Sequence, residues 1–465
     1  MDYEEFIKNK SQVGGCYGFK PIELPSVLKP FQAELASWAI EKGRSAIFAG
    51  CGMGKTLLQL VWADNVARKT NKPVLIVAPL AVTFQTVREA EKFGIECHLS
   101  RDGTVKKPIT ITNYERLSYF NTHDFPGCAL DESGILKSFN GVIRSAIIEF
   151  MRQMHYRLLC SATPAPNDYP ELGSSSEALG ELGLIDMLNR FFKNNSNTSD
   201  LKGRYRGHGT PKMWEGKQWR FKGHAEIPFW RYVCSWARAV RKPSDLGDYD
   251  DSEFILPPLV EREHLIETVN LADGMLIPLP AIGLAEQRDE RKRTVAERCE
   301  KIAKLTCDDS RQSLVWCHLN SEGDRLEKII NGGVQVSGKD SDDQKESKFR
   351  GFIDGDIRVL ITKPKIGAWG LNFQHCSHIA TFVDHSYEAR HQGIHRVYRY
   401  GQKNQVNVDT VITEGDRNVL DNLKRKSIAA DRMFDNLVSC MHEAMGITST
   451  KYEPQNIEVP SWLSQ

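Results

Sequence analysis

Residues 49–56 have the composition and spacing of a loop that binds phosphate. They read Ala-Gly-Cys-Gly-Met-Gly-Lys-Thr, between a short apolar stretch and a run compatible with a helix. Glycines allow successive backbone N–H groups to converge on phosphate oxygens, and the N-terminus of the following helix adds its dipole. Lys55 would then reach the β- and γ-phosphates of a nucleotide, and Thr56 would offer its hydroxyl to Mg²⁺. The glycines expected to contact the nucleotide are Gly50, Gly52 and Gly54.

Two adjacent carboxylates, Asp131 and Glu132, follow the apolar stretch 127–130. A carboxylate at the end of a strand can hold Mg²⁺ through water, and its neighbour can orient an attacking water molecule. We therefore assign Asp131 to the metal and Glu132 to the role of base. Such a pair is often only a solvated strand end, but a parallel sheet that also carries Lys55 could return it to the phosphates.

Hydroxyl groups follow a further apolar stretch, in the segment Ser161-Ala162-Thr163-Pro164. Hydroxyls at a strand end can link a γ-phosphate site to a neighbouring lobe. An ordinary turn that uses Pro164 as a breaker is the alternative interpretation.

Two arginines, Arg396 and Arg399, lie in the basic segment 390–402. Residues three apart share a face if the segment is helical, as its pattern predicts for Arg390–Tyr400. Two guanidinium groups that point into a cleft could neutralise charge on a transferring γ-phosphoryl group. A solvated basic helix is the alternative.

Short apolar runs that alternate with amphipathic stretches predict two parallel sheets covered by helices. The expected strands of a first lobe, residues 25–195, are Ser45–Ala49, Val74–Ala78, Ile109–Thr112, Cys128–Leu130 and Leu158–Cys160. Those of a second lobe, residues 300–430, are Ser313–Cys317, Val334–Val336, Arg358–Ile361, His378–Val383 and Val406–Ile412. Expected helices include Leu57–Lys69, Val82–Phe93, Asp340–Ile353 and a charged helix over Glu286–Lys304.

The composition is that of an ordinary globular enzyme, with 40% apolar and 26% charged residues among 465. A net charge of +1 gives no global positive field, so nucleic acid would need a local basic patch. The eleven cysteines form no CxxC pair, which argues against a zinc or redox motif and fits free thiols in a reducing compartment. No signal peptide or membrane span is evident, so we expect a cytoplasmic protein with no membrane partner.

The segment 202–242 provides such a patch. It holds eleven Lys or Arg residues against two Glu, a net charge of +9, and four of the nine tryptophans. Lysine and arginine neutralise phosphates and exposed aromatic rings stack on bases, which predicts a nucleic-acid path. The alternative is a small inserted domain, and helical spacing makes Trp230 and Trp236 better candidates for its core. The predicted contact residues are Arg204, Arg206, Lys217, Arg220 and Lys222.

The motifs together resemble those of the Swi/Snf-like branch of superfamily-two helicases, in order along most of the chain. The matching segments are 28–32, 49–56 (motif I), 77–80 (motif Ia), 111–115 (motif Ib), 131–134 (motif II), 161–172 (motif III), 314–317 (motif IV), 367–372 (motif V) and 392–402 (motif VI). The resemblance implies two RecA-like P-loop NTPase lobes, an α/β fold, with a basic helical insertion between them. It divides the chain into an extension (1–24), lobe 1 (25–195), insertion and linker (196–260), connector (261–299), lobe 2 (300–430) and tail (431–465).

The resemblance also implies roles for individual residues. Gln32 would recognise adenine, Gly370 and Gln392 would contact the nucleotide, and the arginine pair would complete the site from the second lobe. The residues expected to couple nucleotide state to nucleic-acid grip are Ser161, Thr163 and Asn372. One departure stands out, because Gly134 replaces the histidine that usually ends motif II and links the ATP site to the coupling motifs.

These patterns predict a DNA-dependent ATPase and translocase of helicase type that uses ATP and Mg²⁺. Duplex DNA is favoured over single-stranded DNA, and strand unwinding or protein displacement would be the outcome. The alternatives are an RNA helicase, a clamp on nucleic acid that holds ATP without turnover, and the motor subunit of a restriction or repair machine.

Overall fold

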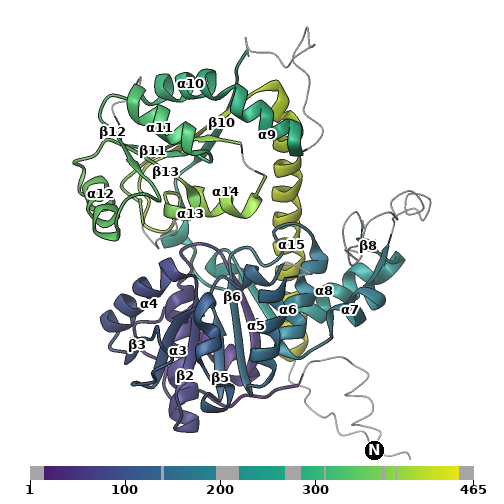
Figure 1. The fold of residues 1–465 in the computed structure, drawn as a ribbon. Helices are drawn as coiled ribbons and strands as arrows, with labels where there is room; N and C mark the ends of the chain where they lie inside the picture. Colours follow the sequence, from purple (N-terminus) through teal and green to yellow (C-terminus); the bar gives the residue numbers. More distant parts are fainter. Residues whose placement is uncertain are drawn as a thin grey trace, which may run out of the picture.

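A computed structural model describes residues 15–137, 141–194, 219–267, 284–307, 311–367, 372–383 and 385–449. It contains two parallel β-sheets, each with helices on its faces, stacked as a lower and an upper lobe in Figure 1. This arrangement fits the predicted two-lobed RecA-like fold. No helix among the described residues has the length and apolar character needed to cross a membrane.

The sheet of the first lobe has seven strands in the order β3-β4-β2-β5-β6-β1-β9. Their bounds are β1 Arg44–Ala49, β2 Val74–Ala78, β3 Cys97–Leu99, β4 Ile109–Asn113, β5 Gly127–Leu130, β6 Tyr156–Ser161 and β9 Ala237–Val240. The five predicted strands are confirmed with small shifts of their ends. Strand β9 comes from the stretch assigned to the insertion, and it pairs in parallel with β1.

Helices cover both faces of this sheet, which explains why its central strands are buried throughout and read as continuous apolar runs. Their bounds are α2 Pro30–Lys42, α3 Lys55–Thr70, α4 Leu80–Lys92, α5 Val142–Arg152, α6 Leu172–Leu179, α7 Leu184–Phe191 and α8 Glu226–Cys234. Short 3₁₀ helices are η1 Tyr114–Tyr119, η2 Thr122–Asp124, η3 Ser133–Lys137, η4 Tyr169–Glu171, η6 Gly223–Ala225, η7 Pro243–Asp245 and η8 Ser252–Phe254.

The second lobe has a six-stranded parallel sheet in the order β10-β15-β14-β11-β13-β12. Its bounds are β10 Leu259–Leu265, β11 Ser313–Trp316, β12 Gly333–Val336, β13 Val359–Thr362, β14 His378–Phe382 and β15 Val406–Ile412. Its helices are α9 Leu284–Arg293, α10 Val295–Cys307, α11 Asn320–Ile329, α12 Asp342–Asp354, α13 Pro364–Gly367, α14 Tyr387–Ile394 and α15 Arg417–Ser449, with η9 Glu414–Asp416 before the last.

Two helix predictions for this lobe are wrong in their bounds. The single charged helix over Glu286–Lys304 is two helices, α9 and α10, separated at Thr294. The helix expected over Arg390–Tyr400 ends at Ile394. The carbonyl of Arg396 accepts a hydrogen bond of 2.9 Å from the backbone N–H of Phe373, so tertiary contacts replace the helical pattern there.

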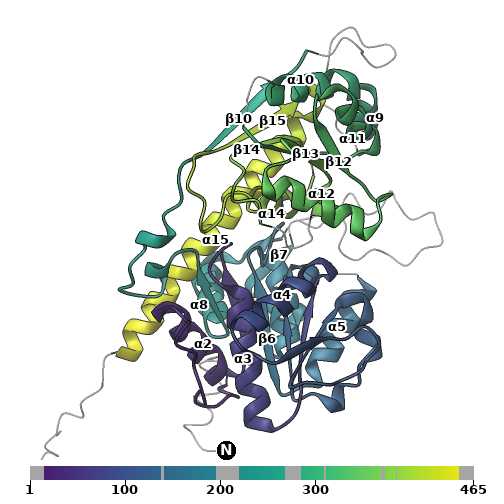
Figure 2. The ribbon, with the colours of Figure 1, turned by 90° about the vertical axis from the view of Figure 1, so that its left-hand side faces the viewer.

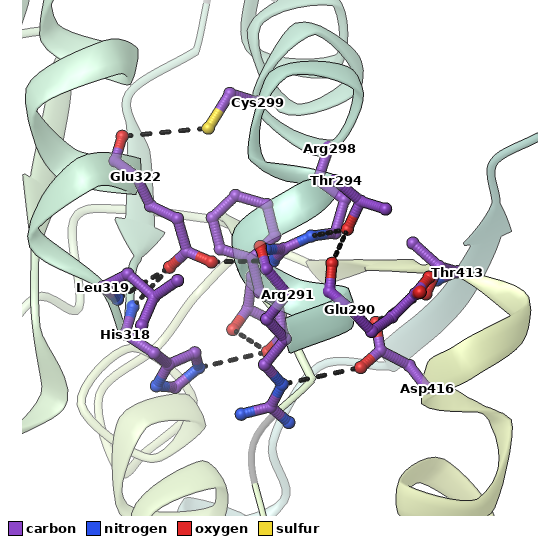
Figure 3. Close-up of polar contacts among 12 residues, drawn as sticks. Glu290, Arg291, Thr294, Arg298, Cys299, His318, Leu319, Glu322, Thr413 and Asp416 are labelled. Carbon is purple, nitrogen blue, oxygen red and sulfur yellow. Dashed lines mark hydrogen bonds and ion pairs between the residues drawn. The ribbon is translucent and has the colours of Figure 1, made fainter. Parts of the chain in front are cut away.

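A buried ion pair ties α10 to α11 inside the second lobe (Figure 3). Arg298 donates to Glu322 at 2.7 Å, and both side chains are only 1% exposed. The same carboxylate accepts from the backbone N–H groups of His318 and Leu319, where α11 begins. The guanidinium also donates to the hydroxyl of Thr294 at 3.1 Å, so its charge is surrounded by partners.

Helix α15 reaches from the second lobe to the first and runs alongside both in Figures 1 and 2. Near its start, Leu420 and Leu423 pack with Val383 of the second lobe. Farther along, Leu437 and Met441 belong to the hydrophobic core of the first lobe. Residues 431–449, predicted to belong to the tail, are therefore the second half of this helix.

The described part of the basic aromatic segment packs on the first lobe. Trp230 and Trp236 are 1% and 0% exposed, which confirms their prediction as core residues. The antiparallel pair β7 Phe192–Asn194 and β8 Trp219–Phe221 lies beside them. Arg220 and Lys222 are exposed at this hairpin. The other predicted nucleic-acid contacts, Arg204, Arg206 and Lys217, lie outside the described residues.

Candidate active site

The glycine loop connects β1 to α3 and has the backbone shape that its composition predicts. Gly52 and Gly54 have φ angles of +90° and +86°, in the left-handed region where side chains are disfavoured. The N–H of Gly50 donates to the carbonyl of Val240 at 2.8 Å, so the edge strand β9 holds the start of the loop. Lys55 donates from Nζ to the carbonyl of Ala49 at 2.9 Å, which folds its ammonium group over the loop.

Gln32 lies directly against the loop, at the start of α2. Its Nε2 donates to the carbonyl of Met53 at 3.0 Å, and its Oε1 accepts from the backbone N–H of Lys29. A Cβ added at Gly54 would lie 2.4 Å from the same Nε2. The side chain predicted to read adenine is thus buried and fixed beside the loop.

Asp131 and Glu132 lie at the carboxyl end of β5. Asp131 accepts a hydrogen bond of 2.8 Å from Gln59 on α3, and its backbone carbonyl accepts from the Tyr114 hydroxyl. Glu132 has a φ of +52°, unusual for a residue with a side chain, and its buried Oε2 has no hydrogen-bond partner. A strained backbone and an unpaired buried oxygen are typical of a functional position rather than a solvated strand end.

Burial raises the pKa of both carboxyl groups, and Lys55 opposes the shift in each case. A divalent cation bound by this pair would further favour the charged form of both carboxyl groups. The neighbouring Thr56 supplies a hydroxyl, and oxygen ligands of this kind suit Mg²⁺. Within the described chain no three His, Cys, Asp or Glu side chains are grouped to hold a metal ion, so phosphate and water oxygens would complete such a site.

Ser161 and Thr163 follow β6, the strand next to β5, and both are buried. The Ser161 hydroxyl accepts from the backbone N–H of Thr163 at 3.0 Å. The Thr163 hydroxyl is buried and has no partner in the structure. The segment therefore keeps one buried hydroxyl without a hydrogen-bond partner after β6, the strand that pairs with β5.

The arginines reach this site from the second lobe. Burial lowers the pKa of Arg396, whereas the neighbouring carboxylates of Glu132 and Asp131 raise it. Arg399 donates to the side chain of Asn372, a predicted coupling residue, and its buried Nε has no partner. Gln392 lies half-buried on α14, and Gly370 lies outside the described residues. Lys55 of the glycine loop, the acidic pair and Arg396 of the second lobe are thus close enough to interact through their charges.

No protein-family model matches the chain. TATA-binding protein-associated factor MOT1 of Saccharomyces cerevisiae is 21% identical over 523 residues, which cover 88% of this chain but only 28% of MOT1. Protein p41 of Acyrthosiphon pisum secondary endosymbiont phage 1 is 24% identical over 412 residues, 77% of this chain and 85% of p41. The solved Sulfolobus solfataricus SWI2/SNF2 ATPase core in complex with dsDNA has 16% identity and a TM-score of 0.41, and covers 92% of this chain and 97% of that one.

Two observations agree: the motifs occur in the expected order on two lobes built on parallel sheets, and the chain is similar to MOT1. They support a Swi/Snf-like superfamily-two helicase core.

The site also contains residues to which the sequence assigned no role. A Cβ added at Gly52 would lie 2.7 Å from the Cβ of Tyr400, so motif VI touches the glycine loop. The Tyr400 ring packs on Phe254 at 5.0 Å, and its hydroxyl contacts Glu253, which pairs with Lys29 beside Gln32. Tyr400 was visible as part of motif VI, but no local pattern marks Glu253 or Phe254.

Proposed function

We propose that this Swi/Snf-like core hydrolyses ATP in the cleft between its lobes and couples the reaction to movement along duplex DNA. The observation that carries the proposal is the meeting of Lys55, Glu132 and Arg396, which come from three distant parts of the chain. The Swi/Snf-like motifs support duplex DNA as the partner, including the Arg-Tyr-Gly-Gln sequence that ends motif VI.

The glycine loop would bind the triphosphate. Its backbone N–H groups and the dipole of α3 favour an anion. Lys55 would exchange its hydrogen bond to the Ala49 carbonyl for phosphate oxygens, and the buried Gln32 would orient the base.

Glu132 would act on the water. Its unpaired Oε2 can accept a hydrogen bond from a water molecule in line with the γ-phosphate, and burial keeps competing solvent away. Arg396 and Arg399 would neutralise the charge that develops on the transferred phosphoryl group. Thr56 and Asp131 would hold Mg²⁺, which neutralises the phosphate charge when bound.

Steady-state ATP turnover, measured with duplex DNA, single-stranded DNA, RNA and no nucleic acid, tests this function. We expect duplex DNA to stimulate turnover most, and rising salt to weaken the stimulation because phosphate contacts release counterions. Lys55→Ala should abolish turnover, whereas replacing Lys72, an exposed lysine that follows the end of α3, by Ala should keep it.

Two outcomes would replace the proposal. Stronger stimulation by RNA than by duplex DNA would indicate an RNA-directed enzyme. ATP binding without turnover under all four conditions would indicate a clamp.

The exposed Arg220 and Lys222 provide a separate test of the nucleic-acid path. We propose that they contact phosphates, so replacing both by Gln should weaken DNA binding and make its dependence on salt less steep. Replacement of the exposed Lys424 and Arg425 on α15 by Gln is the matched control. If both double substitutions changed DNA affinity equally, Arg220 and Lys222 would have no specific role in binding DNA.

A further inference from the structure

The space beside Gly134, where motif II ends, is filled from the opposite lobe. A Cβ added at Gly134 would lie 2.9 Å from Oε1 of Glu388, on α14. It would also lie 3.2 Å from the carbonyl of Thr163 and 3.8 Å from the hydroxyl of Ser161. The absence of a side chain at position 134 therefore admits a carboxylate of the second lobe to the loop that follows motif II and to motif III.

The other oxygen of this carboxylate forms an ion pair with Lys137, at the end of η3. The Glu388 side chain is 16% exposed and that of Lys137 is 35% exposed, so the pair is shielded better than a surface ion pair. The residues are 251 positions apart in the sequence, and the contact joins the lobes directly.

A second polar bridge lies next to the first. Lys426, on α15, donates to the side chain of Asn167 at 2.9 Å and approaches the carbonyl of His385 at 3.4 Å. Asn167 in turn donates to Glu171. Burial lowers the pKa of Lys137, and the charge of Glu171 opposes that shift. The loop after motif II and the tail of motif III are thus linked by polar contacts to α14 and α15 of the second lobe.

Glu388 is well placed to transmit movement between the sites. It lies in the first turn of α14, which begins where the Ser386 hydroxyl accepts from the N–H of Ala389. The same short segment leads to Arg396, whose charge interacts with that of Glu132. A helix of this length moves as a unit, so a contact at its start constrains the arginine that follows its end.

We propose that Glu388 is a positioning residue: its ion pair with Lys137 supplies the link between motif II and the second lobe that Gly134 cannot make. The inference rests on the proposed function, because the link matters when the lobes close on ATP. It assigns a role to two residues that no motif singles out, and it explains how a core with glycine at position 134 can still couple its lobes.

Charge exchange tests the pair. Glu388→Gln and Lys137→Gln should each lower the ratio of DNA-stimulated to basal turnover by about 5-fold or more. The exchanged double variant Lys137→Glu/Glu388→Lys should recover a ratio within about 2-fold of the original, which a merely structural role would not produce. Glu346→Gln removes the exposed pair with Arg350 on α12 and is the matched control.

Gly134→Ala tests whether the Glu388 carboxylate needs the space left by the missing side chain at position 134. Its Cβ should displace the Glu388 carboxylate and lower the ratio as Glu388→Gln does, and the two changes together should be no worse than either alone. Ratios that stay within 2-fold of the original for Glu388→Gln and Lys137→Gln would overturn the proposal. Additive losses from Gly134→Ala and Glu388→Gln would also overturn it.

Small-angle X-ray scattering with a non-hydrolysable ATP analogue separates this inference from the proposed function, because it reports lobe closure without turnover. Glu388→Gln should enlarge the radius of gyration and the exchanged variant should restore it. If no nucleic acid stimulates the unmodified chain but this pattern holds, the proposed function fails and the positioning role stands. Stimulation that Glu388→Gln leaves intact, with an unchanged radius, overturns the positioning role alone.

Discussion

The guanidinium of Arg396 and the carboxylate of Glu132 are close enough to interact through their charges, although the two residues belong to different lobes. The negative charge of Glu132 raises the pKa of Arg396, and the positive charge of Arg396 lowers the pKa of Glu132, each against a larger opposite effect of burial. An arginine held next to the base of a hydrolase can serve the transition state without a large rearrangement.

Arg396→Ala should lower ATP turnover about 10³-fold or more, because the charge that opposes the transferred phosphoryl group is lost. Binding of ATP should change much less, because Lys55 and the glycine loop remain. Turnover and equilibrium binding of a fluorescent ATP analogue separate the two effects. Arg425→Ala, an exposed arginine on α15, is the control, and equal turnover of both variants would contradict the assignment.

Gly52→Ala should abolish turnover. Its φ of +90° costs a side chain on the order of 1 kcal/mol, and the added Cβ would also collide with Tyr400. Gly94→Ala is a matched control, because Gly94 has a φ of +68° with nothing within 4 Å. We expect Gly94→Ala to lower the melting temperature slightly and to keep turnover, so similar activity of the two variants would be inconsistent with contact between Tyr400 and the loop.

Arg298→Met should destabilise the second lobe by about 3–5 kcal/mol, because it leaves the Glu322 carboxylate buried without its charged partner. Arg325→Met removes the ion pair with Glu300, which joins the same two helices at 2.9 Å but is exposed. That change should cost less than about 1 kcal/mol. Urea unfolding followed by circular dichroism compares the two, and equal losses would show that burial does not decide the effect.

Two histidines close in sequence to the arginine pair should make the free energy of unfolding depend on pH. Burial lowers the pKa of His395 to about 4 and lowers that of His391 well below 6.5. Both side chains stay neutral in the folded chain, so their contribution to stability is complete above pH 6.5. Below pH 6.5 only the unfolded chain takes up the protons, and stability falls towards pH 4.

The slope should approach about 1.4 kcal/mol per pH unit for each histidine. Urea midpoints measured from pH 7 to pH 5 test this slope. His391→Asn should flatten the curve, whereas the exposed His123→Gln should leave it unchanged. A curve that His391→Asn does not alter would assign the acid sensitivity to other groups.

The sequence was sufficient for the parts of this fold that local chemistry determines. Strands such as β2 are buried on both faces and therefore stand out as unbroken apolar runs. The loop from Gly50 to Thr56 was recognisable because phosphate binding requires glycine, lysine and a hydroxyl at fixed spacing.

Strand β10 was missed because its sequence, Leu-Val-Glu-Arg-Glu-His-Leu, is largely polar and partly exposed at the sheet edge. The end of α14 was misjudged because a hydrogen bond from Phe373, far in the sequence, captures the carbonyl of Arg396. The pairing of Glu388 with Lys137 had no local signal, since it exists only when the lobes meet.

Helix α15 limits the ways in which the lobes can separate. Its anchor points near Leu420 and Leu437 are joined by continuous helix, which at 1.5 Å per residue spans about 25 Å and hardly stretches. Pulling the lobes directly apart would break one of two apolar contacts. Rotation about the helix, or bending it near the exposed Ile428, would preserve both contacts, so we expect the lobes to rotate about α15 rather than to separate along it.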